Sequence, residues 1–283
     1  MTTPTIKTWG EAFDYTWRVK WKRLSSAPTN KINSNHITNY AGRSLPLKRM
    51  GVAGWWLEMK ACMEDEGRSG STINRIISAG TTVLKFTALA GLHTVVCPKF
   101  ERAKEGEHRL TYFNKEQVDQ MARCAVDIFD RQDLAEAILF SAYTGVRQGE
   151  LLKLRSDDVD VALNQIWVGG KPTLITKGRN CRNIPLHPKI SDLVMNRLDR
   201  DYLFRDDWAN KDDLYRAFKK VRKQCGIAED YVWHSLRHSF GTFLGETTHP
   251  RQIMALMGHA NVETSLRYVK ATDDAIRSAV LAI

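Results

Sequence analysis

Hydrophobic residues in the first hundred positions recur at the three- and four-residue spacing of helices, with no alternating strand pattern. The periodic stretches cover residues 12–24, 51–67 and 71–92. Thr8 and Glu11 have the spacing of a capping box ahead of the first stretch. The aromatic residues that fit the core faces of these helices are Trp9, Trp17, Trp21, Trp55 and Trp56. The pattern predicts a helical domain over residues 1–97.

Residues 98–110 break this periodicity. The stretch contains many charged residues, a proline and a glycine, and little apolar content. Such composition is typical of a linker between domains.

Helical periodicity returns in a second region, residues 111–283. Asn114 can cap a helix over residues 115–126, and a helix over residues 133–145 should end at Gly145. The stretches 165–170 and 172–186 have the β-branched content of a small antiparallel sheet, with a hairpin turn near residues 178–180. After Pro188 the chain is again helical in pattern. The predicted fold is mainly α with a small antiparallel sheet.

Composition indicates in which compartment the protein is expected. No apolar run approaches the roughly 20 residues of a membrane helix, and the N-terminus lacks the pattern of a signal peptide. We therefore expect a cytoplasmic protein with no membrane partner. The five cysteines are scattered without a CxxC pair, which indicates free thiols rather than a zinc site.

The formal net charge of +10 favours a polyanionic partner, most commonly nucleic acid. A basic protein that binds no nucleic acid could have the same net charge. The distribution is uneven, because residues 1–110 carry 17 basic and 9 acidic side chains, a net of +8, and residues 111–283 carry 25 and 23. We expect the N-terminal region to supply most of the nonspecific attraction.

Five short segments of the second region contain side chains that could take part in catalysis. They are TGVRQGE (144–150), ITKGRN (175–180), HSLRH (234–238), MGH (257–259) and LRY (266–268). Each alone is more often structural than functional. Together they contain what phosphoryl transfer without a metal requires. Two guanidinium forks, from Arg147 and Arg237, can hold phosphate oxygens. Tyr268 is a phenolic nucleophile, and Lys177 is an ammonium acid. His234 and His259 can exchange protons near neutral pH.

The order and spacing of these residues resemble the tyrosine site-specific recombinases of the phage integrase family. That family's pattern is Arg, Lys, His-x-x-Arg, His or Trp, Tyr, and the step from His259 to Tyr268 is nine residues. The resemblance covers residues 111–283. It implies a catalytic α/β domain there, and residues 71–91 are similar to the last helices of the family's helical (SAM-like) core-binding domain. We therefore expect a DNA-binding domain over 1–97, a linker over 98–110 and a catalytic domain with a C-terminal tail helix over 111–283.

The resemblance also implies a role for each matched residue. Tyr268 would attack the scissile phosphate and form a 3′-phosphotyrosyl link, with Lys177 as general acid toward the leaving 5′-oxygen. Arg147 and Arg237 would clamp the non-bridging oxygens. His234 would assist proton removal or position the phosphate, and His259 would donate a hydrogen bond to it. Glu150 would orient Arg147, three residues before it. The implied reaction proceeds through a Holliday junction and needs no ATP, metal or other cofactor.

Two residues remain as alternatives. Lys171 is the second candidate for the catalytic lysine, although the sequence around Lys177 favours the latter. His238 lies four residues after His234, a spacing that can bind zinc on a helix, but the HExxH glutamate and a third ligand are lacking. We interpret His238 as a packed histidine or one that supports the site indirectly.

The resemblance further implies partners. Double-stranded DNA is the substrate, a DNA-bending accessory protein is a possible addition, and the enzyme would be nucleoid-associated. The tail after Tyr268 has an apolar stripe at helical spacing, formed by Ala275, Ile276, Ala279, Val280 and Ile283. Docking of this tail on a neighbouring protomer would close a homotetramer on DNA. Docking on its own domain is the alternative.

Two other functions share much of this sequence pattern. A type IB topoisomerase uses the same chemistry but rejoins the same strand, and a DNA-binding protein on the same fold would have no catalysis. The helical region begins within about ten residues of Met1, so we expect no additional arm-binding domain. This favours a simpler recombinase or a phage enzyme of minimal design, acting in integration or excision of a mobile element.

Overall fold

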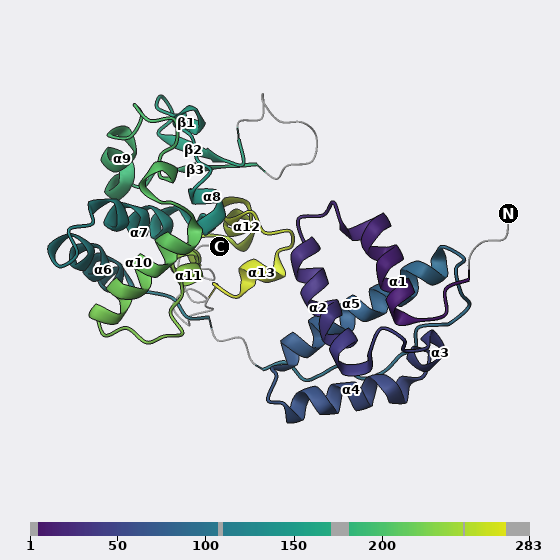
Figure 1. The fold of residues 1–283 in the computed structure, drawn as a ribbon. Coiled ribbons are helices and arrows are strands. Elements are labelled where there is room, and N and C mark those ends of the chain that lie inside the picture. The colour runs from purple at the N-terminus through teal and green to yellow at the C-terminus, as the bar shows by residue number, and fades with distance from the viewer. Residues whose placement is uncertain (1–4, 107–109, 171–180, 246, 270–283) are drawn as a thin grey trace, which may run out of the picture. The chain divides into compact units, whose positions relative to one another are not determined.

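The computed structural model describes residues 5–106, 110–170, 181–245 and 247–269 (Figure 1). The chain divides into two compact units, residues 1–108 and 109–283. The boundary falls inside the predicted linker. Each unit has its own hydrophobic core.

The first unit is helical throughout its described part. Its elements are α1 (Trp9–Thr16), the π-helical turn η1 (Trp17–Trp21), α2 (Ala27–Ala41), α3 (Leu47–Met50), α4 (Ala53–Asp65) and α5 (Gly70–Leu89). The long helix α5 packs against α1, α2 and α4. Gly80 permits this close packing, since a Cβ there would lie 2.5 Å from Ile37 Cδ1 and 2.8 Å from the Trp56 ring.

The predicted capping box ahead of the first helix is confirmed. The Thr8 side chain accepts from the Glu11 backbone N–H, and the Glu11 carboxylate accepts from the Thr8 backbone N–H. The helix α2 was not anticipated as a separate element, because its sequence is largely polar and its apolar stripe is weak.

Part of the predicted linker packs on this unit. Asn74 of α5 exchanges two hydrogen bonds with the backbone of Ala103, at 2.9 and 3.0 Å, and Ala103 is buried.

The second unit is a helical core with a three-stranded sheet. Its helices are α6 (Lys115–Asp127), α7 (Gln132–Thr144), α8 (Gln148–Leu151), α9 (Pro188–Met195), α10 (Lys211–Gln224), α11 (Trp233–Gly245), α12 (Pro250–Met257) and α13 (Glu263–Leu266). Two 3-10 turns are η2 (Ser156–Asp158) and η4 (Arg205–Asp207). Helix α7 packs against α6, α9, α10 and α11. The predicted Asn114 cap is present, with its side chain accepting from Gln117 N–H at 2.7 Å.

The sheet is antiparallel in the order β1 (Val159–Asp160), β2 (Gln165–Val168), β3 (Arg182–Pro185). Strand β1 was not anticipated. Ile166 of β2 pairs with Ile184 of β3, and Val168 pairs with Arg182. The predicted hairpin turn near residues 178–180 lies outside the described residues. The predicted fold class, mainly α with a small antiparallel sheet, is confirmed.

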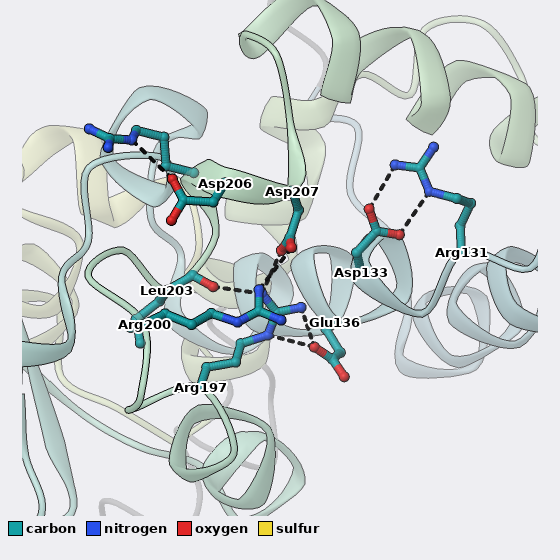
Figure 2. Close-up of polar contacts among 9 residues, drawn as sticks. Arg131, Asp133, Glu136, Arg197, Arg200, Leu203, Asp206 and Asp207 are labelled. Carbon is teal, nitrogen blue, oxygen red and sulfur yellow. Dashed lines mark hydrogen bonds and ion pairs between the residues drawn. The ribbon is translucent and has the colours of Figure 1, made fainter.

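A buried arginine joins three segments of this unit (Figure 2). Arg197 follows α9, and its side chain is 5% exposed. It donates to Glu136 of α7 at 2.6 Å, to Asp207 of η4 at 2.5 Å and to the Leu203 carbonyl at 2.6 Å. Its guanidinium also lies over the Phe204 ring at 4.8 Å. Because all these partners are supplied, the buried charge is compatible with a stable fold.

Replacing Arg197 with Met should leave the partly buried carboxylates of Glu136 and Asp207 without this cation. Breaking a buried ion pair costs about 3–5 kcal/mol, which corresponds to a fall in Tm of roughly 10 °C for a unit of this size. Thermal unfolding followed by circular dichroism measures the change. The control is Arg216→Met, which removes an exposed ion pair with Asp213 at 3.4 Å and should shift Tm by less than about 2 °C. Equal shifts in the two variants would contradict a special role for Arg197.

Candidate active site

The site begins where α7 ends. Gly145 adopts a left-handed conformation with φ of 63° and ends the helix. A Cβ at this position would lie 2.4 Å from the Phe240 ring, so glycine is needed for both conformation and space. The chain then turns sharply, and Arg147 forms the N-cap of the short helix α8.

Arg147 and Glu150 form a closed pair across α8. The Glu150 carboxylate accepts from the Arg147 backbone N–H and from its guanidinium, both at 2.8 Å. The sequence-based prediction that Glu150 reaches Arg147 is therefore confirmed. Arg147 remains 48% exposed on its side chain, so part of its guanidinium faces solvent.

A second arginine, Arg182 of β3, holds the same carboxylate. Its Nη2 and Nη1 atoms donate to the two Glu150 oxygens at 2.8 and 3.3 Å. Burial alone would raise the pKa of Glu150, but hydrogen bonds from Arg182 and Arg147 outweigh it and lower that pKa to about 2. Glu150 is consequently ionised near neutral pH.

Arg237 of α11 is the most deeply buried cation of the site, with 2% exposure. It donates to the Gly145 carbonyl at 2.5 Å and also to the Met257 carbonyl. Burial, followed by repulsion from Arg147 and Arg182, lowers its pKa to about 10. Among the described residues, the one carboxylate that pairs with Arg147 and Arg182 is Glu150, and Arg237 donates to carbonyls. The site therefore carries an excess of positive charge that an anion would relieve.

The histidines lie beside these arginines. His259 follows Gly258, which ends α12 in a left-handed conformation, and its Nδ1 atom lies 2.8 Å from Ser265 Oγ. Burial and the nearby Arg237 lower the pKa of His259 to about 4. His234 lies one turn before His238 on α11, with ring centroids 4.7 Å apart. Burial lowers the pKa of His234 as well. These imidazoles are held toward their neutral form.

Arg147, Glu150, Arg182 and His259 line one pocket of about 360 Å³, together with Gly258, Ala260 and Thr264. The lining is mostly polar and cationic. Its composition suits a compact anion such as a phosphodiester.

Tyr268 sits in a slot on the face of α11. A Cβ on Gly241 would lie 2.8 Å from the Tyr268 ring, and one on Gly245 would lie 1.9 Å from its backbone oxygen. The phenolic oxygen lies 2.8 Å from His238 Nδ1, and the ring stacks on His259 with centroids 6.1 Å apart. The residue is 5% exposed, and burial raises the pKa of its hydroxyl. Burial, followed by His234 and Arg237, lowers the pKa of His238 to about 4, so its ring nitrogen accepts the phenolic hydrogen.

The structure thus brings together five of the six matched residues: Arg147, His234, Arg237, His259 and Tyr268. Lys177 and its alternative Lys171 lie outside the described residues. One contributor, Arg182, was not recognised from sequence, although it could have been suspected as a cation on the inward face of a strand beside Ile184. His238 was expected to be packed or to support the site indirectly, and the structure places it against the Tyr268 hydroxyl.

Among the residues that the structure describes, no group of three or more His, Cys, Asp or Glu side chains is placed to hold a metal ion. The five cysteines are free. No helix in the described segments is long and apolar enough to cross a membrane.

The chain is similar to a family of known proteins. Residues 111–275 match the model of the phage integrase family. Tyrosine recombinase XerA of Thermococcus kodakarensis is 26% identical over 236 residues, covering 79% of both chains. XerA of Pyrococcus horikoshii is 28% identical over 236 residues, covering 79% of this chain and 78% of the relative.

Solved structures extend the likeness to almost the whole fold. The Tn1549 transposon integrase in complex with transposon right end DNA aligns with a TM-score of 0.77 and 17% identity, covering 98% of this chain and 100% of that one. A lambda integrase tetramer bound to a Holliday junction aligns with a TM-score of 0.74 and 16% identity, covering 93% and 77%.

The family match spans more than half of the chain, and the protein therefore belongs to the phage integrase family. It is a tyrosine recombinase, an enzyme of the class that cleaves and rejoins DNA in site-specific recombination.

The slot formed at Gly241 and Gly245 gives a direct test of the position of Tyr268. Gly245→Ala places a methyl group where the Tyr268 backbone oxygen lies, so the tyrosine segment must move. A displacement of about 1 Å at a reacting group can cost about 10² in rate. Single-turnover cleavage of a DNA duplex should therefore fall by at least about tenfold, with little change in DNA affinity. The control is Gly54→Ala, whose Cβ meets nothing within 4 Å. Normal cleavage by Gly245→Ala would contradict this placement of the tyrosine.

Proposed function

We propose that this recombinase cleaves DNA by attack of Tyr268 on the scissile phosphate. The attack forms a 3′-phosphotyrosyl link and releases a 5′-hydroxyl, and rejoining is attack by another 5′-hydroxyl on that link. The observation that carries the proposal is the juxtaposition of three guanidinium groups, one carboxylate and a histidine-bonded phenol. The phosphodiester energy is retained in the tyrosyl link, so the scheme consumes no ATP and assigns no step to a metal.

In this scheme Arg147 and Arg237 hold the non-bridging oxygens of the phosphate. Arg237 is buried and cationic, and its two carbonyl partners fix the direction of its fork. A preorganised, desolvated cation stabilises charge that develops in the transition state more strongly than a solvated one. Glu150 orients Arg147 through its two hydrogen bonds.

The histidines are assigned the proton transfers and a hydrogen bond to the phosphate. When Ser265 donates to Nδ1 of neutral His259, the imidazole hydrogen is on Nε2, where it can donate to a phosphate oxygen. His238 is hydrogen-bonded to the Tyr268 hydroxyl, and His234 is packed against His238. We assign proton removal from Tyr268 to this histidine pair, with His234 also available to position the phosphate.

Tyr268→Phe removes one oxygen atom and leaves the ring in its slot. The variant should bind DNA with normal affinity and form no covalent protein–DNA adduct. A nicked suicide duplex, which prevents religation, makes the adduct visible on a denaturing gel. An adduct that persists in the Phe variant would assign the nucleophile to another residue.

Lys177 is proposed as the general acid toward the leaving 5′-oxygen, on the strength of its place in the motif. Lys177→Ala should slow cleavage by roughly 10²–10⁴. A substrate with sulfur at the bridging 5′ position should rescue this variant, because a thiolate leaves without a proton. The parallel variant is Lys171→Ala. Rescue of Lys171→Ala in place of Lys177→Ala would move the role to Lys171.

The first unit is proposed as the core-binding DNA-binding domain, with residues 98–110 as linker and 111–283 as catalytic domain. Its net charge of +8 over residues 1–110 supports this role. A pocket of about 450 Å³ opens between α2 and α5, and amide and hydroxyl side chains such as Asn30, Asn33 and Ser78 line it beside Arg75. Such side chains contact phosphates and base edges in duplex DNA.

The partner of the catalytic unit is proposed to be duplex DNA in a homotetramer, with an accessory DNA-bending protein as an optional addition and the host nucleoid as location. The likeness to a lambda integrase tetramer on a Holliday junction supports this assembly. The biological role would be integration or excision of a phage or mobile element. Strand exchange between two duplexes separates this function from a type IB topoisomerase. Adduct formation separates it from an inactive DNA-binding protein.

The C-terminal tail is proposed to dock on a neighbouring protomer through the stripe that contains Ile276 and Val280. Deleting residues 272–283 should leave single-site DNA binding nearly intact and weaken assembly of the two-duplex complex, so recombination falls more than cleavage. A matched pair sharpens the test. Ile276→Asp on the stripe should act like the deletion, and Ser278→Asp off the stripe should not. Normal tetramer assembly and strand exchange by the truncated protein would contradict docking in trans.

A further inference from the structure

Arg182 occupies an unusual position for an arginine. It is the first residue of β3 and shares the inward face of the strand with Ile184, and its side chain is only 8% exposed. A buried guanidinium is tolerated when its donors are satisfied. Here Nη1 and Nη2 meet the two oxygens of Glu150, and Nε donates to the Leu256 carbonyl at 2.9 Å.

The Leu256 contact places Arg182 against the end of α12. The last carbonyls of a helix have no partner within it. Two of these, on Leu256 and Met257, accept from Arg182 and Arg237 respectively. The following Gly258 has φ of 64°, and a Cβ there would lie 3.1–3.2 Å from the Arg182 side chain. The guanidinium therefore packs directly against the turn that presents His259.

The Glu150 contact links Arg182 to the charge of Arg147. Glu150 accepts from both arginines, so its negative charge is shared between them. Without Arg182, Glu150 would have Arg147 as its one arginine partner among the contacts described, and that pair would be close to neutral. With Arg182 in place, one net positive charge remains on the three side chains at the mouth of the pocket.

We propose that Arg182 is a positioning residue for cleavage, which holds Glu150 and the Gly258–His259 turn in place and leaves the charge of Arg147 for the phosphate. This inference rests on the proposed roles of Arg147 and His259. It assigns to one strand residue the link between α8 and the end of α12. Direct binding of the phosphate by Arg182 and a purely structural role are the two competing accounts.

The first experiment separates binding from chemistry. Arg182→Met in the full-length protein should lower single-turnover cleavage of a suicide duplex by about 10², the cost expected for a misplaced catalytic group. DNA affinity, measured at fixed salt, should change by less than about threefold, because most of the net positive charge lies in residues 1–110. The control, Arg205→Met, removes an exposed arginine paired with Asp206 and should change neither quantity. Equal losses in affinity and cleavage, or normal cleavage, would overturn the proposal.

The second experiment tests the charge balance. If loss of Arg182 harms cleavage because Glu150 then neutralises Arg147, removing the Glu150 charge should reverse part of the loss. We expect Glu150→Gln to raise the cleavage rate of Arg182→Met by about tenfold, one further charge-assisted hydrogen bond in size. A direct phosphate ligand or a purely structural arginine would not be replaced by this change. An unchanged or lower rate in the double variant would overturn the proposal.

Folding is checked by thermal unfolding of every variant. If Arg182→Met is not folded, Arg182→Lys takes its place in both experiments, since one ammonium cannot span both Glu150 oxygens and the Leu256 carbonyl. We then expect the Lys variant to cleave more slowly than wild type, by less than the factor of about 10² expected for a misplaced catalytic group, and a rate equal to wild type would overturn the proposal. Tyr268→Phe is run in parallel. An adduct in that variant would refute the proposed nucleophile, whereas its absence together with normal cleavage by Arg182→Met would refute only the present inference.

Discussion

Two helices of the catalytic unit end at the same buried guanidinium, that of Arg237. It is 2% exposed and donates to the carbonyl of Gly145 at the end of α7 and to that of Met257 at the end of α12. Helix C-termini carry partial negative charge, which favours a cation at this point. Arg147 lies two residues after Gly145, and His259 lies two residues after Met257. Their placement therefore depends on where Arg237 holds the two helix ends.

The same arrangement leaves the site with uncompensated positive charge. Carbonyl dipoles and one carboxylate offset only part of the charge of Arg147, Arg182 and Arg237. Burial, followed by Arg237 and Arg147, lowers the pKa of His259, and burial, followed by His234 and Arg237, lowers that of His238. A phosphate entering the pocket would relieve this repulsion. Bound phosphate would at the same time raise the proton affinity of the nearby histidines, which lie beside Tyr268, the proposed nucleophile.

Local sequence was sufficient for what depends on local geometry. The Thr8 and Asn114 caps, the Gly145 helix end and the contact of Glu150 with Arg147 all follow from spacings of a few residues. Arg182 could not be placed in this way, because its partner Glu150 is 32 residues away and the contact depends on sheet register and helix packing. The hydrogen bond between His238 and Tyr268 could not be placed from sequence for a similar reason, since the slot at Gly241 and Gly245 that brings Tyr268 to His238 forms only when α11 packs on the chain after α13. Helix α2 was missed because its sequence is nearly all polar.

The central claim is that one residue, Tyr268, becomes covalently attached to DNA. Trypsin cuts after Arg267 and Lys270, so the attachment site would lie on the tripeptide Tyr268-Val269-Lys270. The adduct trapped on a suicide duplex can be digested with trypsin and nuclease and sequenced by tandem mass spectrometry. The account predicts a nucleotide 3′-phosphate on the phenolic oxygen of that tripeptide. A nucleotide on any other peptide, or a 5′-phosphate linkage, would contradict it.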